Sequence, residues 1–108
     1  MTIYVAGPWP RRDECIAVMH HLESQGHIVT SRWLREVMGN SDEAAQTDLN
    51  NVRAASVFLL LNLEKSEGKS VELGYAIALS KQIVLVGART NVFHYLDCVR
   101  VIERVEEL

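Results

Sequence analysis

The segment from residue 57 to residue 76 restricts the fold of this chain more than any other. An almost wholly apolar run, Val57 to Leu63, is followed by a polar loop and then by an apolar helical pattern that begins at Val71. A strand without a polar face belongs inside a parallel sheet, where helices cover both sides. The loop after it then lies at the carboxyl edge of the sheet, which is where open α/β folds bind ligands.

The rest of the chain alternates strands and helices in the same way. Apolar residues at helical spacing predict a helix that ends before Gly26, and Ser41 is a good N-terminal cap for the next helix. Residues 32–40, which include Trp33, fit neither pattern, and we expect them to form a flap. The predicted strands are 2–6, 27–31, 57–63, 82–86 and 99–102, and the predicted helices are 13–25, 42–53 and 71–80.

This order predicts an α/β fold of the flavodoxin-like, doubly wound kind. Short parallel strands joined by helices require right-handed crossovers, which place helices on both faces of the sheet. The expected sheet has five parallel strands in the order 2-1-3-4-5. The strand order reverses between the first and third strands, so residues 7–9 and 64–72 are expected to flank one crevice.

Length and charge exclude several classes of protein. With 108 residues the chain can build one core but not two, so residues 1–108 are expected to form a single domain. A net charge of −3 gives no basic surface for a nucleic acid polymer. No apolar run approaches the length of a bilayer span, and the N-terminus has no signal-peptide pattern. We therefore expect a cytoplasmic protein that does not bind membranes.

Neither the cysteines nor the histidines form a metal-binding pattern. Cys15 and Cys98 are far apart in the sequence and are expected to be buried free thiols. The four histidines have no Cys, Asp or Glu at ligand spacing. We predict no metal and no cofactor.

Two phosphate-binding motifs and one flavin-binding motif are incomplete. Gly68-Lys69-Ser70 resembles the end of a P-loop, but the glycine required five residues earlier is Leu63. A dinucleotide-binding fingerprint is absent, because the first strand is followed by only one glycine, Gly7. An electron carrier of the flavodoxin kind is also disfavoured, since Gly-Pro-Trp-Pro replaces the hydroxyl-rich phosphate loop.

Two carboxylates are candidates for chemistry. Glu72 is expected one or two residues inside its helix, where free backbone N–H groups would lower its pKa and keep it ionised as a possible nucleophile. Asp48 falls on an apolar helical stripe with Leu49 and Val52, so its carboxyl must face a partner, a cleft or a ligand. The alternatives are an acid that only complements a helix dipole, for Glu72, and a side chain bonded to a backbone N–H, for Asp48.

Two aromatic residues near the same edge are equally ambiguous from spacing alone. Tyr4 lies on the first strand and is either a core residue or a ligand contact. Trp9 directly follows the Gly7-Pro8 turn and can either stack on a planar base or pack on the surface.

In combination these residues resemble the nucleoside 2-deoxyribosyltransferase family and its nucleotide N-hydrolase relatives. The resemblance covers most of the chain, and the second and third of its four segments are the specific part. The segments are Ile3-Tyr4-Val5-Ala6-Gly7-Pro8-Trp9, Asp48-Leu49-Asn50-Asn51-Val52, Glu72-Leu73-Gly74-Tyr75-Ala76 and Asn91-Val92-Phe93-His94-Tyr95-Leu96.

The resemblance implies catalytic roles for three residues. Glu72 matches the nucleophile of the family, and Asp48 matches the acid near the base and the glycosidic bond. Tyr4 matches the tyrosine that touches and orients the nucleophile. Gly7 and Trp9 are expected to contact the substrate, because they flank the crevice.

It also implies a site for a 5′-phosphate. Ser66 falls where deoxyribosyltransferases carry an aspartate and nucleoside-monophosphate hydrolases carry a serine. A hydroxyl there, with Lys69 and backbone N–H groups nearby, accepts a phosphate that an acid would repel. His94 lies near the position that reaches the 5′ end of the sugar from a neighbouring subunit. The alternative for His94 is a turn histidine bonded to the backbone.

The expected function is cleavage of the N-glycosidic bond of nucleosides or nucleoside 5′-monophosphates through a covalent glycosyl-Glu72 intermediate. The sugar then passes to another base or to water. The alternative is a non-catalytic nucleotide-sensing module with the same pocket. A chain this short has little material to roof a pocket, and the family builds its sites across subunit contacts, so we expect a homodimer or a higher homo-oligomer.

Overall fold

The computed structural model describes residues 1–108 and has the predicted sheet. Five strands pair in parallel in the order β2-β1-β3-β4-β5. The doubly wound α/β fold expected from the order of elements is therefore confirmed. The strands are β1 (Thr2–Ala6), β2 (Ile28–Val29), β3 (Val57–Leu61), β4 (Gln82–Val86) and β5 (Val99–Ile102).

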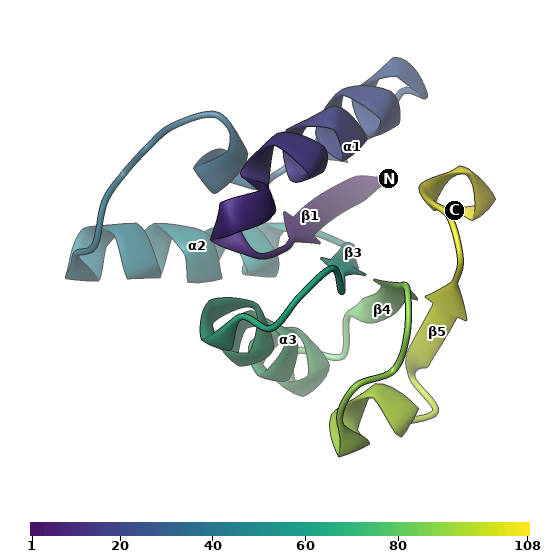
Figure 1. The fold of residues 1–108 in the computed structure, drawn as a ribbon. Coiled ribbons are helices and arrows are strands. Elements are labelled where there is room, and N and C mark those ends of the chain that lie inside the picture. The colour runs from purple at the N-terminus through teal and green to yellow at the C-terminus, as the bar shows by residue number, and fades with distance from the viewer.

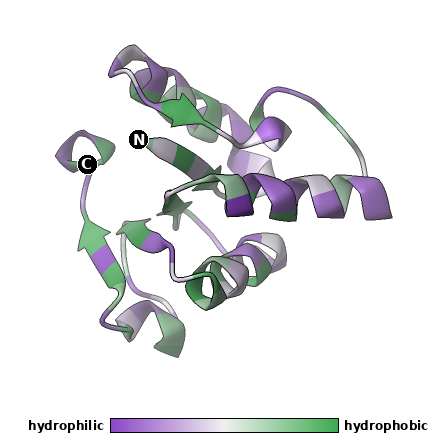
Figure 2. Cartoon of the chain, turned by 180° about the vertical axis from the view of Figure 1, so that it is seen from behind, coloured by the Kyte–Doolittle hydropathy of each residue, from purple (hydrophilic) through white to green (hydrophobic).

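Helices cover both faces of this sheet. Helix α1 lies on one face, and α2 and α3 lie side by side on the other (Figure 1). The N- and C-terminal ends of the chain lie near each other in both views of the ribbon (Figures 1 and 2). The helices are α1 (Arg12–Ser24), α2 (Asp42–Ala54) and α3 (Glu67–Ala78), and the short 3₁₀ turns are η1 (Trp9–Arg11), η2 (Arg32–Leu34), η3 (Val92–Tyr95) and η4 (Val105–Glu107).

The core forms around the central strands. All residues of β3 are buried, as the apolar run at 57–61 predicts. The ring of Tyr4 on β1 stacks on that of Phe58 on β3, with centroids 5.7 Å apart and planes 9° from parallel. Hydrophilic residues predominate along α2 and apolar residues along α3 (Figure 2). None of the helices is both long and apolar enough to cross a membrane.

Four predicted details are wrong. The third strand ends at Leu61 and not at Leu63. The second strand is only Ile28–Val29, because beyond it the Val5 N–H of β1 donates to the Ser31 hydroxyl and not to a strand carbonyl. Cys98 is exposed, since it lies in the turn before β5 rather than inside the strand; Cys15 is buried, as predicted. Helix α3 begins at Glu67, four residues before the predicted start, because Ser66 caps it by accepting a hydrogen bond from the backbone N–H of Lys69.

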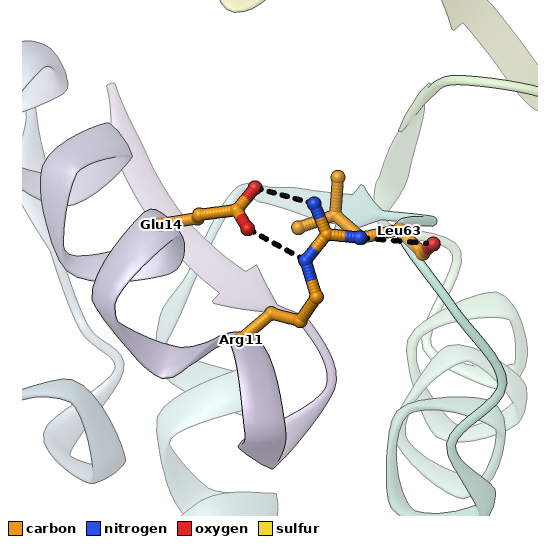
Figure 3. Close-up of polar contacts among 3 residues, drawn as sticks. All are labelled: Arg11, Glu14 and Leu63. Carbon is orange, nitrogen blue, oxygen red and sulfur yellow. Dashed lines mark hydrogen bonds and ion pairs between the residues drawn. The ribbon is translucent and has the colours of Figure 1, made fainter.

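The two loops at the switch in strand order are tied together. Ala6 of β1 pairs with Leu60 of β3, so both strands end at the same level. Arg11 then joins the loops: its guanidinium forms a two-pronged ion pair with Glu14, at 2.6 and 2.8 Å, and donates to the Leu63 carbonyl at 3.4 Å (Figure 3). The turn after β1 is thus held against the chain that leaves β3.

Candidate active site

A cavity of about 690 Å³ opens at the carboxyl edge of the sheet. This is within the usual range for small-molecule sites. Its walls come from the turn after β1, the segment after β2, helix α2 and the first half of α3. The lining residues are Gly7, Trp9, Trp33, Glu36, Val37, Met38, Gly39, Asn40, Ala44, Ala45, Asp48, Leu49, Ser66, Gly68, Lys69, Val71 and Glu72. Six of the eight predicted site residues are among them.

Glu72 lies in the wall of the cavity and is held from the sheet side by Tyr4. The Tyr4 hydroxyl donates a hydrogen bond to Oε2 of Glu72. Tyr4 is fully buried and its ring is fixed against Phe58, so the position of the hydroxyl is well defined. The strand-one tyrosine therefore contacts this carboxylate, as expected for a residue that orients it.

The electrostatic environment of Glu72 differs from the sequence-based expectation. Burial raises the pKa of Glu72 from 4.5 to about 7, the Tyr4 hydrogen bond opposes that rise, and the charge of Asp48 adds to it. The predicted lowering of the pKa is wrong because α3 begins at Glu67. Glu72 lies beyond the first turn and outside the reach of its free N–H groups. The carboxyl group is thus poised to titrate near neutral pH.

Asp48 lies on α2 across from Glu72 and also lines the cavity. Burial raises the pKa of Asp48 above its ordinary value. Its Oδ1 atom is buried and has no hydrogen-bond partner, so this atom makes no bond to a backbone N–H. The apolar stripe of α2 faces the cleft in part, since Ala45 and Leu49 line the same wall. Of the three possibilities for this carboxyl, a partner, a cleft or a ligand, the structure shows the cleft.

Ser66 and Lys69 form the part of the wall at the start of α3. The Ser66 hydroxyl accepts from the Lys69 N–H at 3.4 Å. The Lys69 side chain is buried and its ammonium donates to the carbonyl oxygen of Glu64. Burial lowers the pKa of Lys69, while the charge of Glu64 raises it. A buried cation beside a helix N-terminus is an environment suited to an anion.

Two tryptophans lie close together in the cavity wall. Trp33 is buried and its indole N–H donates to the Val5 carbonyl at 2.9 Å. Trp9 is 54% exposed, its ring lies 6.3 Å from that of Trp33, and the Arg12 guanidinium lies over it at 5.3 Å. Arg12 also donates to the Trp33 and Leu34 carbonyls, at 3.0 Å each. Trp9 therefore keeps aromatic surface exposed in the cavity wall.

Gly7 allows the first turn to come close to α1. A Cβ atom at this position would lie 2.5 Å from Sγ of Cys15 and 3.7 Å from Cβ of Leu61. The lack of a side chain therefore lets the turn pack on the buried Cys15 thiol, and it keeps the backbone in the cavity wall.

His94 does not line the cavity. It is buried in the turn after β4, where its Nδ1 accepts from the Thr90 N–H at 3.0 Å and its Nε2 lies 3.2 Å from Nδ2 of Asn91. Burial lowers the pKa of His94, and the charge of Lys69 lowers it further. The alternative of a turn histidine bonded to the backbone therefore describes this residue in the present chain.

Sequence reasoning did not identify several lining residues. Residues 36–40 were expected only as part of a flap, and Trp33 was noted without a role. An aromatic residue shortly after the second strand is a signal that could have placed Trp33 at the carboxyl edge, because β2 neighbours β1.

We predict that Tyr4→Phe shifts the pH dependence of the site. The substitution removes the hydrogen bond that lowers the pKa of Glu72, so this pKa rises further above its ordinary value of 4.5. If ionised Glu72 is required, the acid-side half-maximum of kcat/KM moves to higher pH, and the loss of rate is larger at pH 6 than at pH 8. The pH–rate profile of the variant measures this. An unmoved acid limb would show that Tyr4 does not tune Glu72.

Two solved structures share this fold. One is a CMP N-glycosidase from Clostridium botulinum, with a TM-score of 0.74 and 19% identity, which covers 99% of this chain and 93% of that one. The other is a 2-deoxyribosyltransferase from Bacillus psychrosaccharolyticus, with a TM-score of 0.76 and 23% identity, which covers 99% and 89%. They are of the two kinds that the sequence resembles. No protein-family model and no curated protein matches the chain.

Proposed function

We propose that this chain cleaves the N-glycosidic bond of nucleosides or nucleoside 5′-monophosphates, with Glu72 as the nucleophile. The observation that carries the proposal is the buried carboxyl of Glu72 in the cavity wall. It accepts a hydrogen bond from Tyr4 and senses the charge of a second carboxyl, that of Asp48. The two structures of the same fold are named as a CMP N-glycosidase and a 2-deoxyribosyltransferase, and both names describe chemistry at such a bond.

In the first step, ionised Glu72 attacks C1′ of the sugar. The C1′–N bond breaks as positive charge develops at C1′, and an Oε atom of Glu72 forms the new bond. The electron pair of the broken bond stays with the base, whose ring nitrogen takes a proton from Asp48. Burial favours the protonated form of Asp48, which suits a general acid.

In the second step, the glycosyl ester on Glu72 is opened by another base or by water. The Asp48 carboxylate accepts the proton of the incoming nucleophile, and Glu72 leaves as a carboxylate that Tyr4 stabilises. Two displacements at C1′ give overall retention of configuration. Water content decides the outcome, because a dry pocket favours transfer and a wet one favours hydrolysis.

The proposed place for the base is the end of the cavity that Trp9 and Trp33 line. The exposed part of Trp9 offers an aromatic face, and Trp33 and Gly7 complete that end of the wall. Stacking of a flat base on an indole tolerates different bases, so this end orients the base without selecting it.

The start of α3 is the proposed place for a 5′-phosphate. Ser66 gives a hydroxyl, Lys69 gives a positive charge, and Gly68 of the first turn of α3 lines the cavity with them. If these residues hold the phosphate, the protein prefers nucleoside 5′-monophosphates to nucleosides.

We predict that Lys69→Met removes a preference for monophosphates. The loss of the cation should lower kcat/KM for a monophosphate by about tenfold to a hundredfold, on the scale of one or two charge-assisted bonds, and leave the nucleoside rate nearly unchanged. Lys65→Met is the matched control, because Lys65 is exposed in the loop before α3. Equal losses for both substrates would contradict a phosphate role for Lys69.

A homodimer or higher homo-oligomer is also proposed. Val92, Phe93 and Tyr95 leave their side chains exposed together on η3, which is unusual for a surface turn. A second copy of the chain that packs on η3 would cover these side chains. It would also lie close to the β4–β5 end of the sheet. Sedimentation equilibrium tests this, and a monomer at concentrations well above those used in the assay would contradict it.

The proposed reaction is tested by release of free base. The protein is incubated with a panel of ribo- and deoxyribonucleosides and their 5′-monophosphates, with and without a second base, and the products are separated by chromatography. Free base alone indicates hydrolysis, and a new nucleoside indicates transfer. Nucleotide binding by calorimetry without either product would contradict the enzymatic proposal and favour a non-catalytic sensing module.

A further inference from the structure

Two buried polar atoms on α2 lack hydrogen-bond partners, and they are of complementary kinds. Oδ1 of Asp48 is an acceptor and Nδ2 of Asn51 is a donor, and neither has a partner. Buried polar atoms are nearly always paired in folded proteins, so each such exception calls for an explanation.

The two side chains belong to one face of the helix. Asp48 and Asn51 are three residues apart within α2, which places their Cβ atoms about 5–6 Å from each other. Rotation about side-chain bonds alone is enough to bring an amide N–H to a carboxyl oxygen over that separation. The backbone need not move. The backbone carbonyl of Asn51 is already held, because it accepts a hydrogen bond from the Thr30 hydroxyl at 2.8 Å.

A direct contact of these atoms with a ligand is a poorer explanation. Both atoms are shielded by protein, although the Asp48 side chain lines the cavity elsewhere. Asn51 is not among the lining residues. The unpaired donor therefore belongs to a residue outside the cavity lining, and a partner within the protein explains it better than a ligand does.

We propose that Asn51 is a positioning residue whose Nδ2 amide donates a hydrogen bond to Oδ1 of Asp48 when Asp48 becomes ionised. The role rests on the proposed function, in which the Asp48 carboxyl gives its proton to the departing base and is left as a carboxylate. A hydrogen bond to an ionised acceptor is stronger than one to a neutral acid. The bond from Asn51 thus strengthens as the proton leaves, which favours the transition state over the ground state.

The charged surroundings of Asp48 do not supply such a donor. Tyr4 from β1 and Glu72 from α3 are the groups that sense its charge, and the Tyr4 hydroxyl is engaged with Glu72. Glu72, when ionised, opposes ionisation of Asp48. Asn51, three residues away on the same helix, carries a buried amide donor without a partner.

The test is a pH titration of Asp48 by ¹³C NMR of the full chain with labelled aspartate. The sequence contains four aspartates, Asp13, Asp42, Asp48 and Asp97, so the spectrum is simple, and Asp48→Asn assigns the signal. All proteins carry Glu72→Gln, which removes the coupled titration of Glu72. Asn51→Leu removes the amide and keeps the side-chain volume, and Asn50→Leu is the matched control because Asn50 is exposed.

We expect the Asp48 midpoint to move to higher pH in Asn51→Leu and to stay in place in Asn50→Leu. With Glu72 restored, Asn51→Leu should lower kcat about tenfold with little change in KM, and the part of the pH–rate profile that reports Asp48 should shift in the same direction. Asn51→Ala gives the same measurement if the leucine variant does not fold. An unchanged midpoint in a folded variant overturns the pairing.

This titration does not need turnover. A shifted midpoint in a protein that releases no base would support the pairing and contradict the proposed function. Base release together with an unshifted midpoint would support the proposed function and contradict the pairing.

Discussion

Glu72→Gln is expected to abolish base release while the chain remains folded. An amide keeps the size of the side chain and its contact with the Tyr4 hydroxyl, but it cannot form the glycosyl ester. Loss of a nucleophile that acts together with a general acid lowers kcat on the order of 10⁴-fold or more. Chromatographic assay of free base measures the loss. Glu67→Gln is the matched control, because Glu67 is an exposed carboxylate in the first turn of the same helix.

The same variant should gain stability at alkaline pH. The folded-state pKa of Glu72 is about 7 against 4.5 for the ordinary group, so the folded state holds a proton that the unfolded state releases. For the wild type, the contribution of Glu72 to the free energy of unfolding is highest below pH 4.5 and falls as the pH rises toward 7. The fall amounts to about 3 kcal/mol.

Denaturant unfolding at pH 5 and pH 8 distinguishes these effects. Glu72→Gln should lose less stability than the wild type over that interval, although it has lost its activity. A variant that is both active and as pH-sensitive as the wild type would contradict the assignment of Glu72. A variant that is inactive because it unfolds would be identified by the same denaturation curves.

Asp48→Asn is expected to have the second largest effect. An amide cannot give a proton to the departing base, and loss of a general acid costs about 10²–10⁴-fold in rate. The loss should be smaller for a halogenated analogue of the preferred base, since a base that carries an electron-withdrawing group leaves with less need of a proton. The ratio of kcat/KM for the two substrates, in the wild type and the variant, measures this dependence.

The control for Asp48→Asn is Asp42→Asn, at an exposed position on the same helix. Asp42 bonds to the Gln46 amide at 2.8 Å and does not line the cavity. A loss in Asp48→Asn that is the same for both bases would contradict proton donation by Asp48, and it would leave only a role in binding.

The fold followed from the sequence because its main determinants are local. The apolar run at Val57–Leu61 required a buried parallel strand, and the alternation of strands and helices left few topologies. Errors occurred at element ends. The start of α3 was placed where its apolar pattern begins, whereas the Ser66 cap and the acidic first turn extend the helix back to Glu67. The early end of β2 depends on the Ser31 hydroxyl accepting the Val5 N–H, and composition does not encode that contact.

The site was predictable in position but not in its electrostatics. Strand order was enough to place Glu72 at the crevice, whereas the resemblance placed Asp48 near the glycosidic bond and Tyr4 against Glu72. The raised pKa of Glu72 was not predictable from the sequence, because it depends on how deeply neighbouring elements bury the carboxyl. The unpaired amide of Asn51 likewise appears only when the side chains around it are placed.

The covalent intermediate is the central claim, and mass spectrometry of a trapped adduct tests it most directly. A substrate with fluorine at C2′ slows both steps, because fluorine opposes positive charge at C1′, and a good leaving base restores the first step so that the ester accumulates. Trypsin cuts after Lys69 and Lys81 and releases residues 70–81, in which Glu72 is the only carboxylate side chain. We predict that this peptide carries the mass of the fluorinated sugar, with its phosphate if a monophosphate is used. An active protein that carries the sugar on another peptide would contradict the account.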